Sequence, residues 1–164
     1  MITRLTKDNL MDVATLYIDS WHQTYQQLVP KTYLDTLNKQ DALNKWTSFL
    51  QYTIEKPVIY GAYDYNGKLL GFMALRNLTP YQGEVYALYL ASEAKGRGLG
   101  RKLVNQAKSH FTAEGCQEML IWVMKANQPA VQFYQHLGGQ LIDHRMSEFD
   151  DVLVEDEAYR WYLS

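Results

Sequence analysis

The residues best suited to chemistry lie in one segment, Val85–Phe111, which reads VYALYLASEAKGRGLGRKLVNQAKSHF. Its centre carries three glycines, Gly96, Gly98 and Gly100, each separated by one residue. Glycine permits positive φ and lets a ligand approach the main-chain amides closely. Basic side chains surround the glycines, namely Lys95, Arg97, Arg101 and Lys102. Unpaired amides at a helix start and clustered positive charge indicate a site for a phosphate or pyrophosphate, although such a turn can also serve only as a connection.

The elements on either side of these glycines predict how they are held. Val85–Leu90 is apolar and aromatic, which favours a strand, and apolar residues recur every four positions from Leu99 to Phe111, which favours a helix ending at Gly115. The apolar run Glu118–Lys125 is typical of a central strand covered on both faces. A strand, a helix and a second strand in this order predict a crossover unit with the two strands parallel.

A second segment, Asn127–Gly139, reads NQPAVQFYQHLGG and predicts another helix. Pro129 suits its first turn, and Gly138 with Gly139 would end it. Tyr134 lies on the apolar face of this helix. From spacing alone it is a core tyrosine.

The rest of the chain predicts an alternation of strands and helices. The expected strands are Ile2–Leu5, Val58–Asp64, Lys68–Arg76, Gly83–Leu90, Gln140–Phe149 and Leu153–Leu163. The expected helices are one that Asp8 caps and that runs to about Ser20, followed by Lys31–Leu37 and Asp41–Gln51. Asn66-Gly67 predicts a type I′ hairpin turn, in which both residues have positive φ.

Length and composition exclude several classes of protein. The 164 residues suit one domain, residues 1–164, and 47% apolar with 13% aromatic content argues against disorder. A net charge of −2 argues against a general nucleic-acid partner. The one cysteine, Cys116, excludes an internal disulfide, and no Cys/His spacing indicates a metal site. Without a leader or a long apolar run, we expect a cytoplasmic protein with no membrane partner.

The glycine segment resembles the pyrophosphate-binding signature of the GCN5-related N-acetyltransferases (the GNAT family). That signature has Arg or Gln, any two residues, Gly, any residue, and Gly or Ala. Gly98 and Gly100 match it, and Lys95 stands in place of Arg or Gln. Asn127–Gly138, N-x-x-A-x-x-F-Y-x-x-L-G, resembles the second sequence block of the same family. The resemblance implies an α+β fold with a mixed, strongly twisted sheet of about seven strands and helices on both faces.

The resemblance also implies acetyl-CoA as acetyl donor and assigns roles by position. Backbone groups of Leu88, Tyr89 and Leu90 would pair with the pantetheine arm as if it were a strand. The pyrophosphate would lie on the loop formed by Lys95, Gly96, Arg97, Gly98, Leu99, Gly100 and Arg101. Asn127 would hydrogen-bond the cofactor, and Tyr134 would lie near the sulfur and protonate the departing thiolate.

The general base and the acceptor site each have candidate residues with a structural alternative. Glu84 is a candidate base, with a solvated strand-end glutamate as the alternative. Trp21 and Tyr25 would wall the substrate cleft, with core packing as the alternative. The run Glu148–Glu157, EFDDVLVEDE, would attract a small cationic amine such as a polyamine or amino sugar, unless it is only a solvated hairpin.

We therefore expect acetyl transfer from acetyl-CoA to the primary amine of a small molecule, by direct attack in a ternary complex. An acetyltransferase acting on a protein N-terminus or lysine is one alternative, and a coenzyme A-binding sensor without catalysis is another. A homodimer is compatible with the sequence, which does not decide the oligomeric state.

Overall fold

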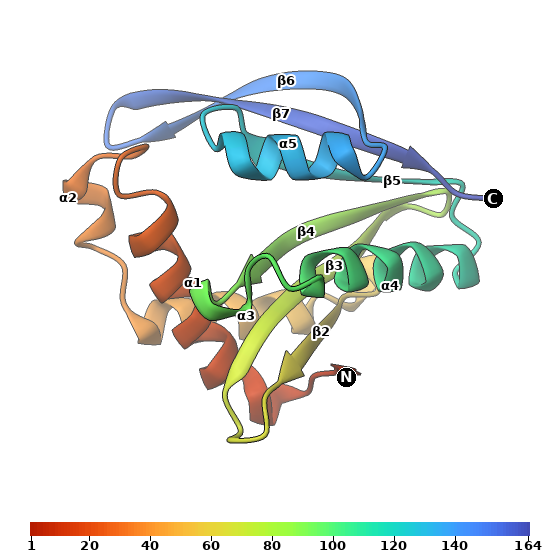
Figure 1. Cartoon of the computed structure of the whole chain (residues 1–164), viewed down its shortest axis with the longest axis horizontal. Coiled ribbons are helices and arrows are strands. Elements are labelled where there is room, and N and C mark those ends of the chain that lie inside the picture. Colours follow the sequence, from red (N-terminus) through yellow and green to blue (C-terminus); the bar gives the residue numbers. More distant parts are fainter.

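A computed structural model describes residues 1–164 and contains one seven-stranded sheet with helices on both faces (Figure 1). The strand order is β1-β2-β3-β4-β5-β7-β6, and only β4 and β5 pair in parallel. The strands are β1 Ile2–Arg4, β2 Val58–Tyr63, β3 Leu69–Thr79, β4 Gln82–Leu90, β5 Glu118–Met124, β6 Gln140–Phe149 and β7 Val152–Tyr162. The predicted α+β class, the mixed sheet and the parallel crossover are confirmed.

The helices divide between the two faces of the sheet. They are α1 Leu10–Thr24, α2 Lys31–Leu34, α3 Lys39–Gln51, α4 Leu99–Ala113 and α5 Gln128–His136, with short 3₁₀ turns at Lys7–Asn9, Thr53–Glu55 and Ser92–Ala94. One buried cluster joins α1 and α3 to the sheet, and a second joins α4 and α5 to its opposite face. No helix is both long and apolar enough to cross a membrane.

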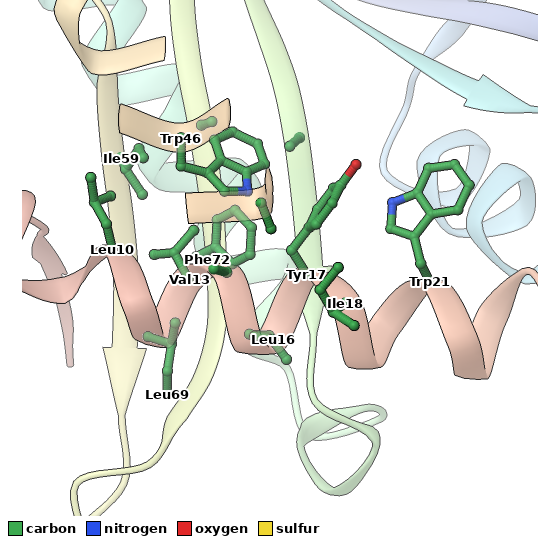
Figure 2. Packing of buried hydrophobic residues seen from close by; sticks show 14 of the residues in the cluster. Leu10, Val13, Leu16, Tyr17, Ile18, Trp21, Trp46, Ile59, Leu69 and Phe72 are labelled. Atoms are coloured by element: carbon green, nitrogen blue, oxygen red, sulfur yellow. The ribbon is translucent and has the colours of Figure 1, made fainter. Parts of the chain in front are cut away.

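The α1 face is an aromatic core (Figure 2). Buried residues of α1 recur at helical spacing, among them Leu10, Val13, Tyr17 and Trp21, so that one side of the helix lies against the sheet. Trp46 of α3 is fully buried. Its ring meets the Tyr17 ring edge-on, with centroids 5.5 Å apart. The helices α1 and α3 therefore cover the face of β4 that lies opposite α4 and α5.

On the opposite face, α4 lies close to the sheet and ends where predicted. A Cβ atom on Gly83 would lie 2.3 Å from the Phe111 ring, so glycine is required for this approach. Gly115 has φ of 84°, and the Cys116 amide donates to the Phe111 carbonyl at 2.9 Å, which closes the helix end. The glycine loop is thereby held at the opposite end of a fixed helix.

Two predictions about the first helix were wrong. Thr6, not Asp8, caps the first helical segment, because the Thr6 hydroxyl accepts from the Asp8 amide while Asn9 reaches back to the Thr6 amide. The helix that follows also runs beyond Ser20 to Thr24.

The hairpin at Asn66-Gly67 is not a type I′ turn. Of the two residues only Gly67 has positive φ, and the Asp64 carboxylate accepts from the backbone amides of both Asn66 and Lys68. The two-residue turn with both residues at positive φ lies between β6 and β7, at Asp150 and Asp151.

Candidate active site

The sheet separates at one place, between β4 and β5. Their pairing stops at Val85 opposite Ile121, and Figure 1 shows the two strands diverging beyond this point. Tyr86 is an extra residue in the β4 ladder, because Leu75 and Ala74 of β3 pair with Val85 and Ala87. From Tyr86 to Leu90, β4 thus has one edge without a neighbouring strand. That edge includes Leu88, Tyr89 and Leu90, where the pantetheine arm was predicted to pair.

The glycine loop presents a row of free amides. The backbone N–H groups from Gly96 through Arg101 donate to no carbonyl or side chain, and the next amide, of Lys102, bonds to Gly98 O at 3.1 Å. Gly96 and Gly98 have φ of 75° and 85°, so the loop curls through a conformation that other residues rarely adopt. Amides without partners at the start of α4 suit an anionic oxygen ligand.

The basic side chains around the loop have no ion-pair partners. The side chains of Lys95, Arg97, Arg101 and Lys102 are exposed, and none lies within ion-pair distance of a carboxylate. Several surface cations elsewhere have ion-pair partners, as Lys125 has in Glu155 at 2.9 Å. The loop therefore keeps its positive charge available to a ligand.

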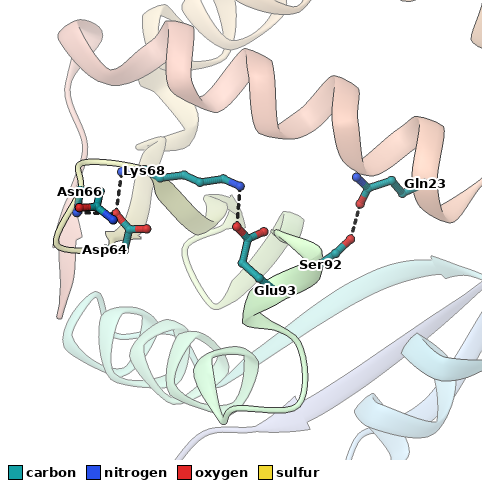
Figure 3. A network of polar contacts seen from close by, with 6 residues as sticks. All are labelled: Gln23, Asp64, Asn66, Lys68, Ser92 and Glu93. Carbon is teal, nitrogen blue, oxygen red and sulfur yellow. Dashed lines mark hydrogen bonds and ion pairs between the residues drawn. The ribbon is translucent and has the colours of Figure 1, made fainter.

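The approach to the loop is anchored on two sides (Figure 3). Lys68 of the β2–β3 hairpin pairs with Glu93 at 2.6 Å, and the Ser92 hydroxyl donates to the Gln23 side chain at the end of α1. The hydrogen-bonded ion pair between Lys68 and Glu93 raises the pKa of Lys68 and lowers the pKa of Glu93. Exposed pairs of this kind contribute little stability, but here they fix where the loop begins.

Gly100 and Leu99 have packing roles within the loop. A Cβ atom on Gly100 would lie 2.9 Å from the Phe133 ring, so α4 and α5 approach each other closely here. Leu99 is half-buried and lies close to Gly71 of β3. These contacts hold the start of α4 beside the free edge of β4.

Asn127 and Tyr134 lie across the opening from β4. Asn127 precedes α5, and its side chain does not cap that helix but lies beside the Tyr25 hydroxyl, where it partly offsets the rise in the Tyr25 pKa that burial causes. Tyr134 is buried on the α4 side of the sheet. Burial raises the pKa of Tyr134 well above its ordinary value, and the neighbouring Tyr25 hydroxyl adds to the shift. The phenol is thus a permanent hydrogen-bond donor, and the structure brings it near Tyr25.

Glu84 faces the opposite side of the sheet from Tyr134. It is only 5% exposed, so the alternative of a solvated strand-end glutamate is wrong. Its carboxylate accepts from Arg76 Nε at 2.6 Å, and this is its one side-chain hydrogen bond. The two candidate proton-handling residues therefore lie on opposite faces, on either side of the gap between β4 and β5.

Trp21 and Tyr25 belong to an aromatic cluster that closes the end of this gap. Trp21 is 8% exposed, and its indole donates to the Tyr89 hydroxyl at 3.2 Å, which favours the packing interpretation. Tyr25 is half-buried, with its ring centroid 4.3 Å from that of Trp21. Tyr33 and Phe149 complete the cluster. Tyr25 is thus better placed than Trp21 to touch a substrate.

The acidic run Glu148–Glu157 has less free negative charge than its sequence indicates. Asp156 is buried and paired with Arg145 at 3.2 Å, and Glu155 pairs with Lys125. Glu157 is buried and accepts from the Tyr159 hydroxyl at 3.0 Å. Asp150 accepts from Thr32 at 2.7 Å, which ties the β6–β7 hairpin to α2.

Arg76 is the site residue that sequence reasoning missed. It pairs with Glu84 because β3 and β4 place the two directly opposite each other. The register of that hairpin identifies the pair, but the ladder shifts between Asn77 and Thr79. Counting back from the turn without this shift would pair Arg76 with Val85 instead of Glu84.

Comparisons with known proteins agree with this geometry. A family model described as "Acetyltransferase (GNAT) family" matches residues 13–139. The uncharacterized N-acetyltransferase YuaI of Bacillus subtilis is 28% identical over 158 residues, covering 94% of this chain and 88% of that protein. A mycothiol acetyltransferase of Corynebacterium glutamicum is 35% identical over 71 residues, or 43% of this chain and 24% of that protein. The PaiA N-acetyltransferase of Thermoplasma acidophilum, solved with coenzyme A, has a TM-score of 0.78 at 21% identity, covering 99% of this chain and 98% of that one.

Proposed function

The chain belongs to the acetyltransferase (GNAT) family and is an acetyl-CoA-dependent N-acetyltransferase, and we propose that its acceptor is the primary amine of a small molecule. The proposal includes direct transfer within a ternary complex. The observation that carries the donor half of the proposal is the row of free amides from Gly96 through Arg101, next to the free β4 edge. Together these would supply a pyrophosphate site and a pantetheine site next to each other, which supports acetyl-CoA as the donor.

The cofactor has a complementary group for each of its parts. The loop amides and the cations beside them, including Lys95, Arg97 and Arg101, would bind the pyrophosphate. The edge from Leu88 to Leu90 would pair with the amides of the pantetheine arm. Asn127 would hydrogen-bond the arm from the other side of the gap.

The acceptor must lose a proton before it can attack. An alkylamine with a pKa near 10.4 is neutral in about one molecule in two thousand at pH 7, which costs about 4–5 kcal/mol. Glu84 is the proposed base, acting directly or through water. Its pairing with Arg76 holds one carboxylate oxygen and leaves the other for the amine proton.

The neutral amine then attacks the thioester carbonyl, a C–N bond forms, and the C–S bond breaks. A backbone N–H on the free stretch of β4 would stabilise the oxyanion between these steps. Tyr134 would donate a hydrogen bond to the departing sulfur. Full proton transfer from a phenol of pKa about 10 to a thiolate of pKa about 8.5 is uphill by about 2 kcal/mol, and burial of Tyr134 raises its pKa further. Hydrogen bonding is therefore its main contribution, and the acceptor's own proton completes the thiol.

An acceptor panel tests the proposal. The protein is mixed with acetyl-CoA and small primary amines, with peptides bearing a free N-terminus or a lysine, and with no acceptor. Free thiol is followed, and products are identified by mass. Faster thiol release with small amines and an N-acetylated product supports the proposal, whereas acetylation of the peptides alone would replace it with a protein acetyltransferase.

A further inference from the structure

A cavity of about 240 Å³ opens on the α3 side of the sheet, beside the Glu84–Arg76 pair. Its walls include Lys45, Phe49, Tyr52, Glu55, Arg76 and Tyr86. The volume lies just below the range of about 300–1,000 Å³ that is typical of pockets for drug-sized ligands, so a smaller molecule fits.

Tyr86 of β4 forms one wall of the cavity. Arg76 joins the cavity to β4, because its Nε atom bonds Glu84 at 2.6 Å and its guanidinium carbon lies 4.4 Å from the centroid of the Tyr86 ring. Tyr86 is also the first residue of β4 beyond its last pair with β5. A molecule in the cavity would therefore lie against Arg76, the partner of the candidate base, and against Tyr86, where the unpaired stretch of β4 begins.

Lys45 gives the cavity an unpaired positive charge. Lys45 is half-buried as a residue, and its ammonium group lies 5.1 Å from the Tyr86 ring centroid and 5.5 Å from that of Trp46. It donates to the Tyr86 hydroxyl at 2.9 Å, yet no carboxylate lies within ion-pair distance of it. Arg76, in contrast, already forms ion pairs with Glu84 and Glu55. An ammonium that lies beside aromatic rings and has no counter-ion favours an anionic ligand.

We propose that this cavity is the acceptor subsite and that the acceptor is a small amino-acid-like molecule with a primary amine and a carboxylate. The inference rests on the proposed acetyl transfer. The carboxylate would pair with Lys45 while the amine points to Glu84. The apolar part would pack on Phe49 and Tyr86, whose rings are stacked with centroids 5.2 Å apart.

Kinetics with matched acceptors test the assignment. L-phenylalanine and L-leucine are compared with their methyl esters, and the readout is the ratio of kcat/KM for acid over ester. Loss of one charge-assisted contact, as in Lys45→Met, should lower this ratio about 10- to 100-fold. Lys45→Glu should invert the preference. Lys39→Met, at the exposed start of the same helix, should leave the ratio as in the wild type.

A binding measurement separates this inference from the proposed function. Each amino acid is titrated calorimetrically into the wild type and into Lys45→Met, with thermal unfolding to confirm that the variant is folded. Binding that Lys45→Met weakens supports the cavity, even where no acetyl transfer is detected and the proposed function fails. Transfer to other amines with no binding or acetylation of amino acids would overturn the cavity and leave the function intact. An acid-to-ester ratio that is unchanged in Lys45→Met would overturn it too.

Discussion

Replacing Gly98 by leucine should weaken coenzyme A binding far more than it weakens the fold. Gly98 has φ of 85°, and nothing lies within 4 Å of the position that a Cβ atom would occupy. The folding cost is therefore backbone strain of about 1–2 kcal/mol. For a chain of this size that lowers Tm by roughly 2–8 °C.

The binding cost is larger because the change redirects the amides that face the ligand. A hydrogen bond to a charged group contributes about 1.5–3 kcal/mol. Losing two of them costs about 3–6 kcal/mol, or roughly a 10²- to 10⁴-fold rise in Kd. Gly98→Asn should lose less, since asparagine tolerates the left-handed conformation better.

Gly115→Leu is the matched control. Gly115 has φ of 84° and equally open surroundings, but it lies beyond the other end of α4, about 22 Å away at 1.5 Å per residue. Both variants are followed by thermal unfolding and by calorimetric titration with coenzyme A. The reasoning fails if the two variants lose similar stability and both bind coenzyme A as the wild type does.

The remaining predictions concern chemistry. Tyr134→Phe should lower kcat about 10²-fold with coenzyme A affinity unchanged; an unaltered rate would mean that another group serves the thiolate. Glu84→Gln should lower kcat/KM by about 10²-fold at neutral pH, and the deficit should shrink as rising pH deprotonates the amine; a deficit constant with pH would exclude Glu84 as base. Asp150→Asn with Asp151→Asn should leave the salt dependence of kcat/KM as in the wild type, because no residue of the β6–β7 hairpin lines the cavity proposed for the acceptor; a KM for cationic amines that rises in this double variant would support the cationic-amine hypothesis. Initial rates should give intersecting rather than parallel double-reciprocal lines, as a ternary complex requires.

Local rules predicted the parts of the fold that depend on neighbouring residues. The positive φ of Gly98 and Gly115, the helix between them and the parallel crossover follow from glycine chemistry and from apolar spacing. The ligand class of the loop follows from the sequence alone, because the amides that would bind the ligand belong to the backbone.

Features that depend on register or on distant partners were not predictable. The Asp64 carboxylate competes for the turn amides and displaces the type I′ geometry expected at Asn66-Gly67. Burial of Glu84 depends on Arg76, which a shifted ladder places opposite it. Lys45 is notable only because Trp46, Tyr86 and Tyr17 surround its ammonium group, and these residues come from three different elements.

The split between β4 and β5 makes direct transfer the economical mechanism. Tyr134 lies on the α4 side of the sheet and Glu84 on the α3 side, so donor and acceptor can approach the gap from opposite faces without exchanging places. A covalent acetyl-enzyme would need a nucleophile at that gap. The only thiol, Cys116, lies beyond the far end of α4, where it is buried against Asn77 and burial raises its pKa. A thiol of this kind is a poor nucleophile, and it is about the length of α4 away from the loop that would hold the donor.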